Sequence, residues 1–166
     1  MKYEECQAHW FGEVSNLKEL EKILNKYGYT ISNYAPFYTP KSYFPIEDDI
    51  LNFKGNNDFK ECFCFDEEYP DLLGAAILSN NEVVAMAGIN QSGKYSLEIG
   101  ISVLPEYQGK GYATKLVKSI TARAHLEFPE MIVTYDSQFT HNQSINVAIR
   151  SGFEQAWYEI FFSKNK

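Results

Sequence analysis

Residues 99–114 read IGISVLPEYQGKGYAT, and this stretch decides the fold class. The apolar residues before Pro105 predict a strand, which ends there because proline has no N–H group for a strand ladder. A turn with Gly109 and Gly111 then leads into a helix. Glycine lets the backbone bend sharply and approach a bound group closely. The free N–H groups and the positive dipole at the start of a helix favour an anion, above all a phosphate.

Comparison with known phosphate-binding motifs indicates which ligand such a turn binds. A Walker loop requires glycine where this chain has Leu104, and the dinucleotide fingerprint requires glycine where it has Thr114. The pattern [Q/R]-x-x-G-x-[G/A] is met by Gln108, Gly111 and Ala113. That pattern is short, and the strand before it and the helix after it make it informative.

Hydrophobic periodicity predicts the remaining elements. A helix is expected at Leu17–Tyr27, and residues 29–60 are expected to form loops with a short helix near Asp48–Phe53. Strands are expected at Glu61–Phe65, Gly74–Leu78, Glu82–Ile89, Tyr95–Leu104, Met131–Tyr135 and Ala156–Phe162, and further helices around residues 113–124 and at Asn142–Ser151. The C-terminal half therefore reads β-β-β-α-β-α-β, a mixed α/β (α+β-like) arrangement.

Length and composition exclude several classes of protein. The 166 residues predict one domain, and 45% hydrophobic with 22% charged residues is a globular composition. No window approaches about 18 apolar residues, so we expect no membrane contact, and the N-terminus shows no secretory signal. The odd number of cysteines (Cys6, Cys62 and Cys64) fits the reducing cytoplasm, and their spacing predicts no metal site.

The distribution of charged residues bears on the charge of the molecules that the protein can bind. The net charge is −7, and the absence of a basic stripe argues against nucleic-acid binding. Residues 1–82 carry 15 acidic and 7 basic side chains, whereas residues 83–166 carry 7 and 8. This imbalance would favour a cationic partner, but a solvated acidic surface is the preferred interpretation.

A second segment, residues 141–153 or HNQSINVAIRSGF, lies downstream of the loop. With both segments and the strands from Gly74, residues 61–162 resemble the GNAT superfamily of acyl-CoA-dependent N-acetyltransferases. The resemblance implies a central mixed twisted sheet with splayed central strands, flanked by helices. It also implies one domain over 1–166, in which residues 61–162 form the CoA-binding core and residues 1–60 help build the acceptor side.

The resemblance assigns cofactor-binding residues by position. The backbone of the loop would hold the CoA pyrophosphate, through Gln108, Gly109, Lys110, Gly111, Tyr112, Ala113 and Thr114. Ile101 and Val103 would pair with the pantetheine amides, and a main-chain N–H near Ile101 would polarise the thioester carbonyl. Asn142 and Ser144 would lie near the pantetheine arm and the sulfur.

Two positions depart from the family pattern. His141 stands where the family has its helical Asn, which here comes one place later as Asn142. Ala148 stands where the family has the Tyr that protonates the thiolate. Water, Tyr135 or Tyr158 would then supply that proton.

A general base, or a water chain ending on one, is expected to deprotonate the amine. Some family members place a catalytic Glu near the position of Glu98, ten residues before Gln108. An exposed carboxylate or a cross-strand salt bridge is the alternative for Glu98. His141 is a weaker candidate for the base.

The sequence therefore predicts an enzyme that moves an acetyl group from acetyl-CoA to a primary amine in a ternary complex. The acceptor would be a small molecule or a peptide, and neither a metal nor an acyl-enzyme is expected. A CoA-binding sensor without catalysis is the alternative, favoured by Ala148. A homodimer stays open as a hypothesis.

Overall fold

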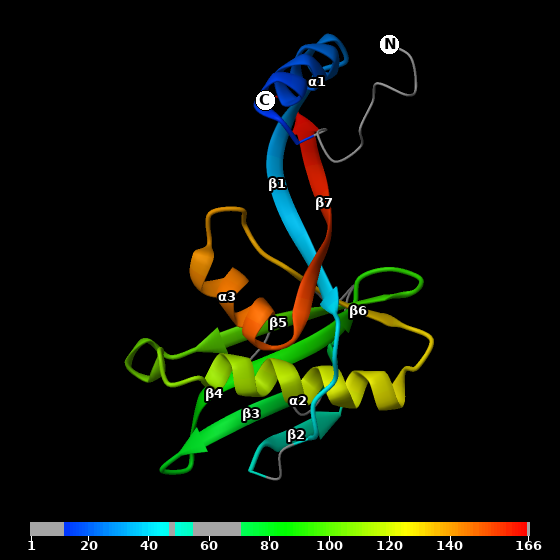
Figure 1. Ribbon diagram of the computed structural model, residues 1–166. Helices are drawn as coiled ribbons and strands as arrows, with labels where there is room; N and C mark the ends of the chain where they lie inside the picture. The colour runs from blue at the N-terminus through cyan, green and yellow to red at the C-terminus, as the bar shows by residue number, and fades with distance from the viewer. Residues whose placement is uncertain (1–11, 47–48, 55–70, 166) are drawn as a thin grey trace.

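The computed structural model describes residues 12–46, 49–54 and 71–165 of the chain. Within them lie three α-helices and one 3-10 helix, namely α1 (Val14–Lys26), α2 (Tyr112–Glu127), α3 (Asn142–Arg150) and η4 (Pro105–Tyr107). The strands are β1 (Tyr29–Pro40), β2 (Leu51–Lys54), β3 (Asp71–Ser79), β4 (Glu82–Gln91), β5 (Ser96–Val103), β6 (Ile132–Asp136) and β7 (Phe153–Lys164). They form one mixed sheet in the order β2-β3-β4-β5-β6-β1-β7, which confirms the mixed α/β class (Figure 1).

The centre of the sheet is covered by α2 because one side of that helix is apolar. Leu116, Val117 and Ile120 are fully buried and belong to the same hydrophobic cluster as Leu97 and Ile99 of β5. Both α2 and α3 lie on this side of the sheet (Figure 1). We call it the helix face. Since successive side chains of a strand point to opposite sides, the residues between the core positions lie on the other side, which we call the opposite face.

Residues 29–54 differ from the prediction. The expected loops at 29–40 are the long strand β1, and the expected helix near Asp48–Phe53 is contradicted by strand β2. Pro36 and Pro40 lie within β1, where they pair in register with Tyr158 and Phe153 of β7. The prolines and weak periodicity of this segment indicated loops, but pairing with a remote strand overrides local preference.

Strand β1 joins the sheet between β6 and β7. It pairs along its length with β7, whereas only Phe37 and Tyr38 are in register with β6. The rest of the β1–β7 pair extends beyond the sheet and carries α1 at its far end (Figure 1). The Glu21 carboxylate of α1 accepts hydrogen bonds from the Thr30 hydroxyl and, at 2.8 Å, from the Ile31 N–H. These bonds fix the helix to the strand.

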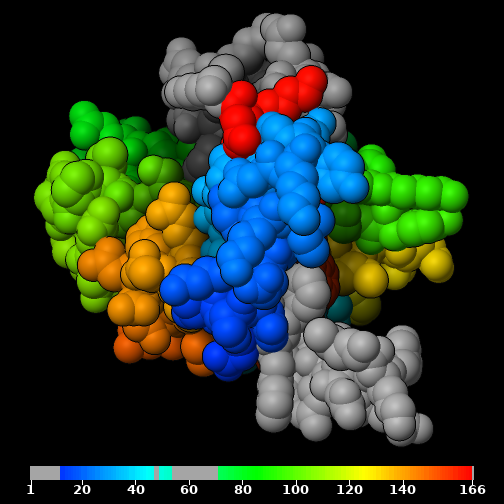
Figure 2. Space-filling model, turned by 90° about the horizontal axis from the view of Figure 1, so that it is seen from above, coloured from blue at the N-terminus to red at the C-terminus, as the bar shows by residue number. Residues whose placement is uncertain are grey.

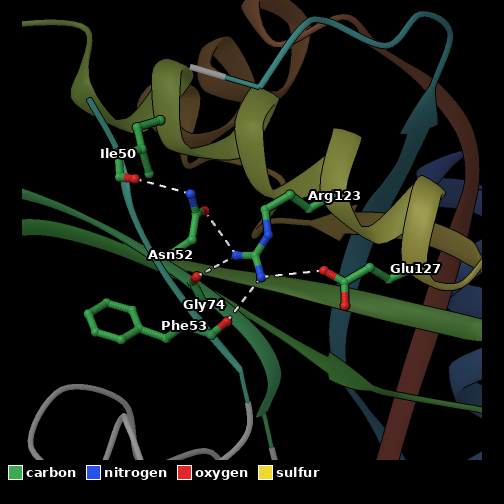
Figure 3. A network of polar contacts seen from close by, with 6 residues as sticks. All are labelled: Ile50, Asn52, Phe53, Gly74, Arg123 and Glu127. Carbon is green, nitrogen blue, oxygen red and sulfur yellow. Dashed lines mark hydrogen bonds and ion pairs between the residues drawn. The ribbon is translucent and has the colours of Figure 1, made fainter. Parts of the chain in front are cut away.

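The short strand β2 is held by a buried arginine of α2 (Figure 3). Arg123 is only 7% exposed and donates to the carbonyl oxygens of Gly74 at 2.8 Å and Phe53 at 3.1 Å. It also donates to the side-chain oxygen of Asn52 at 2.9 Å, and its ion pair with Glu127 measures 3.5 Å. One side chain thereby ties β2, β3 and α2 together.

Most of the other predicted helices and strands are present in the structure. The helices and strands expected at Leu17–Tyr27 and from Gly74 onward are confirmed, with the last strand longer than expected. The strand expected at Glu61–Phe65 and the three cysteines lie outside the described residues. No helix among the described residues has the length and hydrophobicity to cross a membrane.

Candidate active site

Strands β5 and β6 run parallel and then part. Their register covers only Ser96–Glu98 against Ile132–Thr134, although β5 continues to Val103 and β6 to Asp136. Beyond Glu98, β5 stays paired with β4 as far as Val103. The two central strands therefore splay, as the resemblance implied, and one edge of β5 is left without a strand partner among the described residues.

A cavity of about 380 Å³ lies at this splay on the helix face. Its wall comes from β5, the loop before α2, the end of β6 and one side of α3. The lining residues are Ile101, Val103, Tyr107, Gln108, Gly109, Gly111, Tyr112, Ala113, Thr114, Tyr135, His141, Gln143, Ser144, Asn146, Val147 and Arg150. Figure 2 shows α3 (orange) and the loop before α2 (yellow-green) next to each other on one side of the molecule.

The loop before α2 presents main-chain donors to the cavity. Gly109 and Gly111 have φ angles of 75° and 84°, a left-handed conformation that glycine adopts without strain. The first backbone bond of the helix runs from Lys115 N–H to the Gly111 carbonyl at 3.0 Å. Among the described residues, no carbonyl accepts the N–H groups of residues 109–114. These free donors suit a diphosphate, so the cavity residues fit the group that the sequence implied.

Tyr135 brings a phenol into the cavity from β6. Its side chain is 1% exposed, and its hydroxyl lies 2.9 Å from the Ser144 hydroxyl of α3. Burial raises the pKa of Tyr135, and the hydrogen bond with Ser144 opposes that rise. Ala148 is fully buried, so α3 offers no phenol at the family's usual place.

Glu98 lies on the opposite face, because its neighbours Leu97 and Ile99 are in the core on the helix face. Burial raises the pKa of Glu98 to about 7, and the charge and hydrogen bond of Asp136 add to the rise. Burial also raises the pKa of Asp136. Glu159 of β7 adds a further negative charge that acts on both carboxyls. Glu98 and Asp136 therefore form a hydrogen-bonded pair that holds a proton near neutral pH.

Residues 29–153 match the family model described as the acetyltransferase (GNAT) family. This chain belongs to the GNAT family. No curated protein matches it.

Solved GNAT structures share the fold at low sequence identity. A GNAT-family protein from Novosphingobium aromaticivorans is 16% identical with a TM-score of 0.63, over 84% of this chain and 69% of its own. A GCN5-related N-acetyltransferase-like protein from Streptococcus suis is 16% identical with a TM-score of 0.56, over 92% and 69%. A GCN5-related N-acetyltransferase from Kribbella flavida is 11% identical with a TM-score of 0.61, over 87% and 63%.

Most of the GNAT positions named from sequence meet at the cavity. Ile101, Val103, Ser144, Tyr135 and the loop residues other than Lys110 line it. Lys110 instead places its ammonium 4.4 Å from the ring centre of Tyr107, and Asn142 is exposed outside the lining. The binding roles assigned to all of these residues stay predictions.

The two other catalytic candidates lie away from the lining. Glu98 is across the sheet, beside the splay. Tyr158 of β7 is 43% exposed and stacks on Tyr34 with ring centres 5.0 Å apart. Of the two tyrosines proposed as acids, only Tyr135 reaches the cavity.

Sequence reasoning missed two groups of site residues. Gln143, Asn146, Val147 and Arg150 follow the spacing of one helix side, and that signal was available. Asp136 directly follows the predicted strand Met131–Tyr135, but nothing in the sequence places it against Glu98. The pairing of the two carboxyls depends on the register of β5 and β6.

Proposed function

We propose that this GNAT protein transfers the acetyl group of acetyl-CoA to a primary amine. One observation carries the proposal: the splay of β5 and β6 lies between a cavity lined by free main-chain donors and a buried carboxyl pair on the opposite face. A donor bound on one side and an amine bound on the other would meet at the splay.

The donor side uses the cavity on the helix face. The N–H groups of residues 109–114 would hold the pyrophosphate, and the unpaired edge of β5 at Ile101 and Val103 would hold the pantetheine arm. Acetyl-CoA supplies an acyl group already activated as a thioester. A preorganised main-chain N–H near Ile101 would stabilise the negative charge that develops on the acyl oxygen.

The acceptor side uses Glu98 as the base. A primary amine with a pKa of about 10 is protonated at neutral pH, and attack requires the free base. A carboxyl with a pKa of about 7 is a stronger proton acceptor than an ordinary glutamate. Glu98 therefore takes the proton that the attacking nitrogen loses, and Asp136 holds Glu98 in place through their hydrogen bond.

Tyr135 is the acid that protonates the leaving thiolate of coenzyme A. Burial keeps its phenol protonated, and Ser144 fixes the direction of the hydroxyl from 2.9 Å. Tyr135 donates its proton to the thiolate, so a strand residue does the work that the family assigns to the tyrosine replaced here by Ala148.

A sensor that binds CoA without catalysis is the second candidate, and the buried Ala148 is the observation that favours it. Calorimetry with acetyl-CoA and a thiol-release assay over a broad panel of amines separate the two functions. Binding together with amine-dependent thiol release supports the enzyme. Binding without release supports the sensor, and absence of binding overturns both.

A further inference from the structure

A second buried carboxyl lies on the opposite face, two strands away from Glu98. Asp71 of β3 is the register partner of Asn90 in β4, and Asn90 is the register partner of Glu98 in β5. Partners in register point to the same side of a sheet. Asp71 and Glu98 therefore stand on one side of the sheet, with their Cα atoms separated by two strand spacings of about 4.8 Å each.

Two glycines lie beside this row. Gly88 of β4 and Gly100 of β5 are partners in register, and both alternate with core residues, so the side chains they lack would point to the opposite face. A Cβ atom at Gly88 would come within 2.9 Å of the Asp71 Oδ1 atom. The carboxyl of Asp71 thus lies against Gly88, on the face that also carries Glu98, and Asn90 stands between Asp71 and Glu98 in the register.

One oxygen of the Asp71 carboxyl is buried without a hydrogen-bond donor. The residue is 3% exposed, and its Oδ1 atom has no hydrogen-bond partner among the described residues. Burying a carboxyl without a partner is costly, and here it raises the pKa of Asp71 to about 7. A cation bound next to Asp71 would supply both the hydrogen bond and the countercharge.

We propose, building on the function proposed above, that the acceptor is a short α,ω-diamine: one amino group reacts beside Glu98 while the other, as an ammonium, is held by Asp71. The spacing of about 10 Å between the Cα atoms of Asp71 and Glu98 suits a chain as short as that of diaminobutane or diaminopentane. Asp136 and Glu159 add negative charge near Glu98, which disfavours acceptors with an anionic tail.

The kinetic test compares acceptors that differ only at the far end. Thiol release is measured with diaminobutane, aminobutanol and aminobutanoate, which end in a cation, a neutral group and an anion. We expect kcat/KM for diaminobutane to exceed that for aminobutanol by about tenfold or more, because a site built for an ammonium rejects an analogue that lacks it. In Asp71→Asn that preference disappears, because the amide carries no charge to hold the far ammonium.

Matched variants separate this effect from a loss of folding. Glu82→Gln removes an exposed carboxylate of the same sheet and keeps the preference for the diamine. Gly88→Ala keeps the Asp71 charge but places a methyl group against its carboxyl, so it also loses the preference. The affinity for coenzyme A, bound on the helix face, shows that each variant is folded.

A binding measurement keeps this inference separate from the proposed reaction. Calorimetry of diaminobutane and aminobutanol is run on the wild type and on Asp71→Asn, with and without coenzyme A. If no amine is acetylated, the transfer reaction fails, while selective diamine binding that Asp71→Asn abolishes still supports the site. Equal behaviour of the diamine and the amino alcohol in the wild type, or an unchanged preference in Asp71→Asn, overturns the inference.

Discussion

Glu98 and Asp136 show how two ordinary carboxyls acquire a function at the scale of single residues. Each would be ionised in water at neutral pH, but burial raises both pKa values. The charge of Asp136 raises the pKa of Glu98 further, whereas the hydrogen bond with Glu98 opposes the rise at Asp136. The hydrogen bond between them lets the pair keep one proton. This is the arrangement expected of a base that works near neutral pH.

Glu98→Gln is predicted to lower kcat by about a hundredfold or more, because the amide cannot accept the proton of the amine. In the wild type, kcat/KM rises with pH through about 7, since Glu98 is active only when ionised. A pH profile of thiol release and calorimetry with acetyl-CoA check both statements. The affinity for acetyl-CoA stays within about twofold, because Glu98 lies outside the cavity.

Asp136→Asn is the matched control for the pH profile. It removes the like charge that raises the pKa of Glu98, so the rising limb moves to lower pH. A wild-type profile that is flat around neutral pH, or a rising limb that does not move in Asp136→Asn, contradicts the role given to this pair.

The loop before α2 carries the function at the scale of an element. Its two left-handed glycines turn the chain so that consecutive N–H groups are free at the start of the helix. Other residues adopt this conformation at a cost of about 1 kcal/mol or more.

Gly111→Ala is predicted to weaken binding of coenzyme A by about tenfold, since the loop relaxes away from its left-handed conformation. Gly28→Ala is the matched control, because Gly28 has φ 78° and likewise an open space for a Cβ atom, but lies beside α1. Both variants lose about 1 kcal/mol of stability, and only Gly111→Ala loses affinity in calorimetry. Equal affinity in the two variants argues against the loop as the pyrophosphate site.

Arg123 shows that a short strand can depend on one helix side chain (Figure 3). Arg123→Met is predicted to lower the free energy of unfolding by about 3 kcal/mol, because the carbonyls of Gly74 and Phe53 lose their buried donor. Denaturant unfolding measures the loss. Lys18→Met on exposed α1 changes stability by less than about 0.5 kcal/mol, and a similarly small effect of Arg123→Met would show that the network is not needed.

The sheet divides the whole molecule into two chemical sides. The cavity for the donor lies on the helix face, the acidic residues lie on the opposite face, and the splay of β5 and β6 connects them. Strand β1 completes this arrangement by lying between β6 and β7, so a segment from the N-terminal part of the chain borders the site.

Tyr38→Ala is predicted to lower the free energy of unfolding by about 3 kcal/mol, because this β1 side chain is 4% exposed and belongs to the same core cluster as Tyr135. Tyr27 is 75% exposed, so Tyr27→Ala is expected to lower the free energy of unfolding by less than about 0.5 kcal/mol. Thermal unfolding compares the two variants. A small effect of Tyr38→Ala would show that β1 is not part of the cooperative core.

The sequence by itself determined the fold class and the turn before α2, because strand periodicity, glycine positions and helix signals are local, and the resemblance of its two motifs indicated the family. It could not determine that residues 29–40 form a strand, since their partner β7 is more than a hundred residues away and their prolines indicated loops. Nor could it bring Asp136 and Asp71 to the same face as Glu98. Those placements follow from strand register and burial, and only the folded sheet sets both.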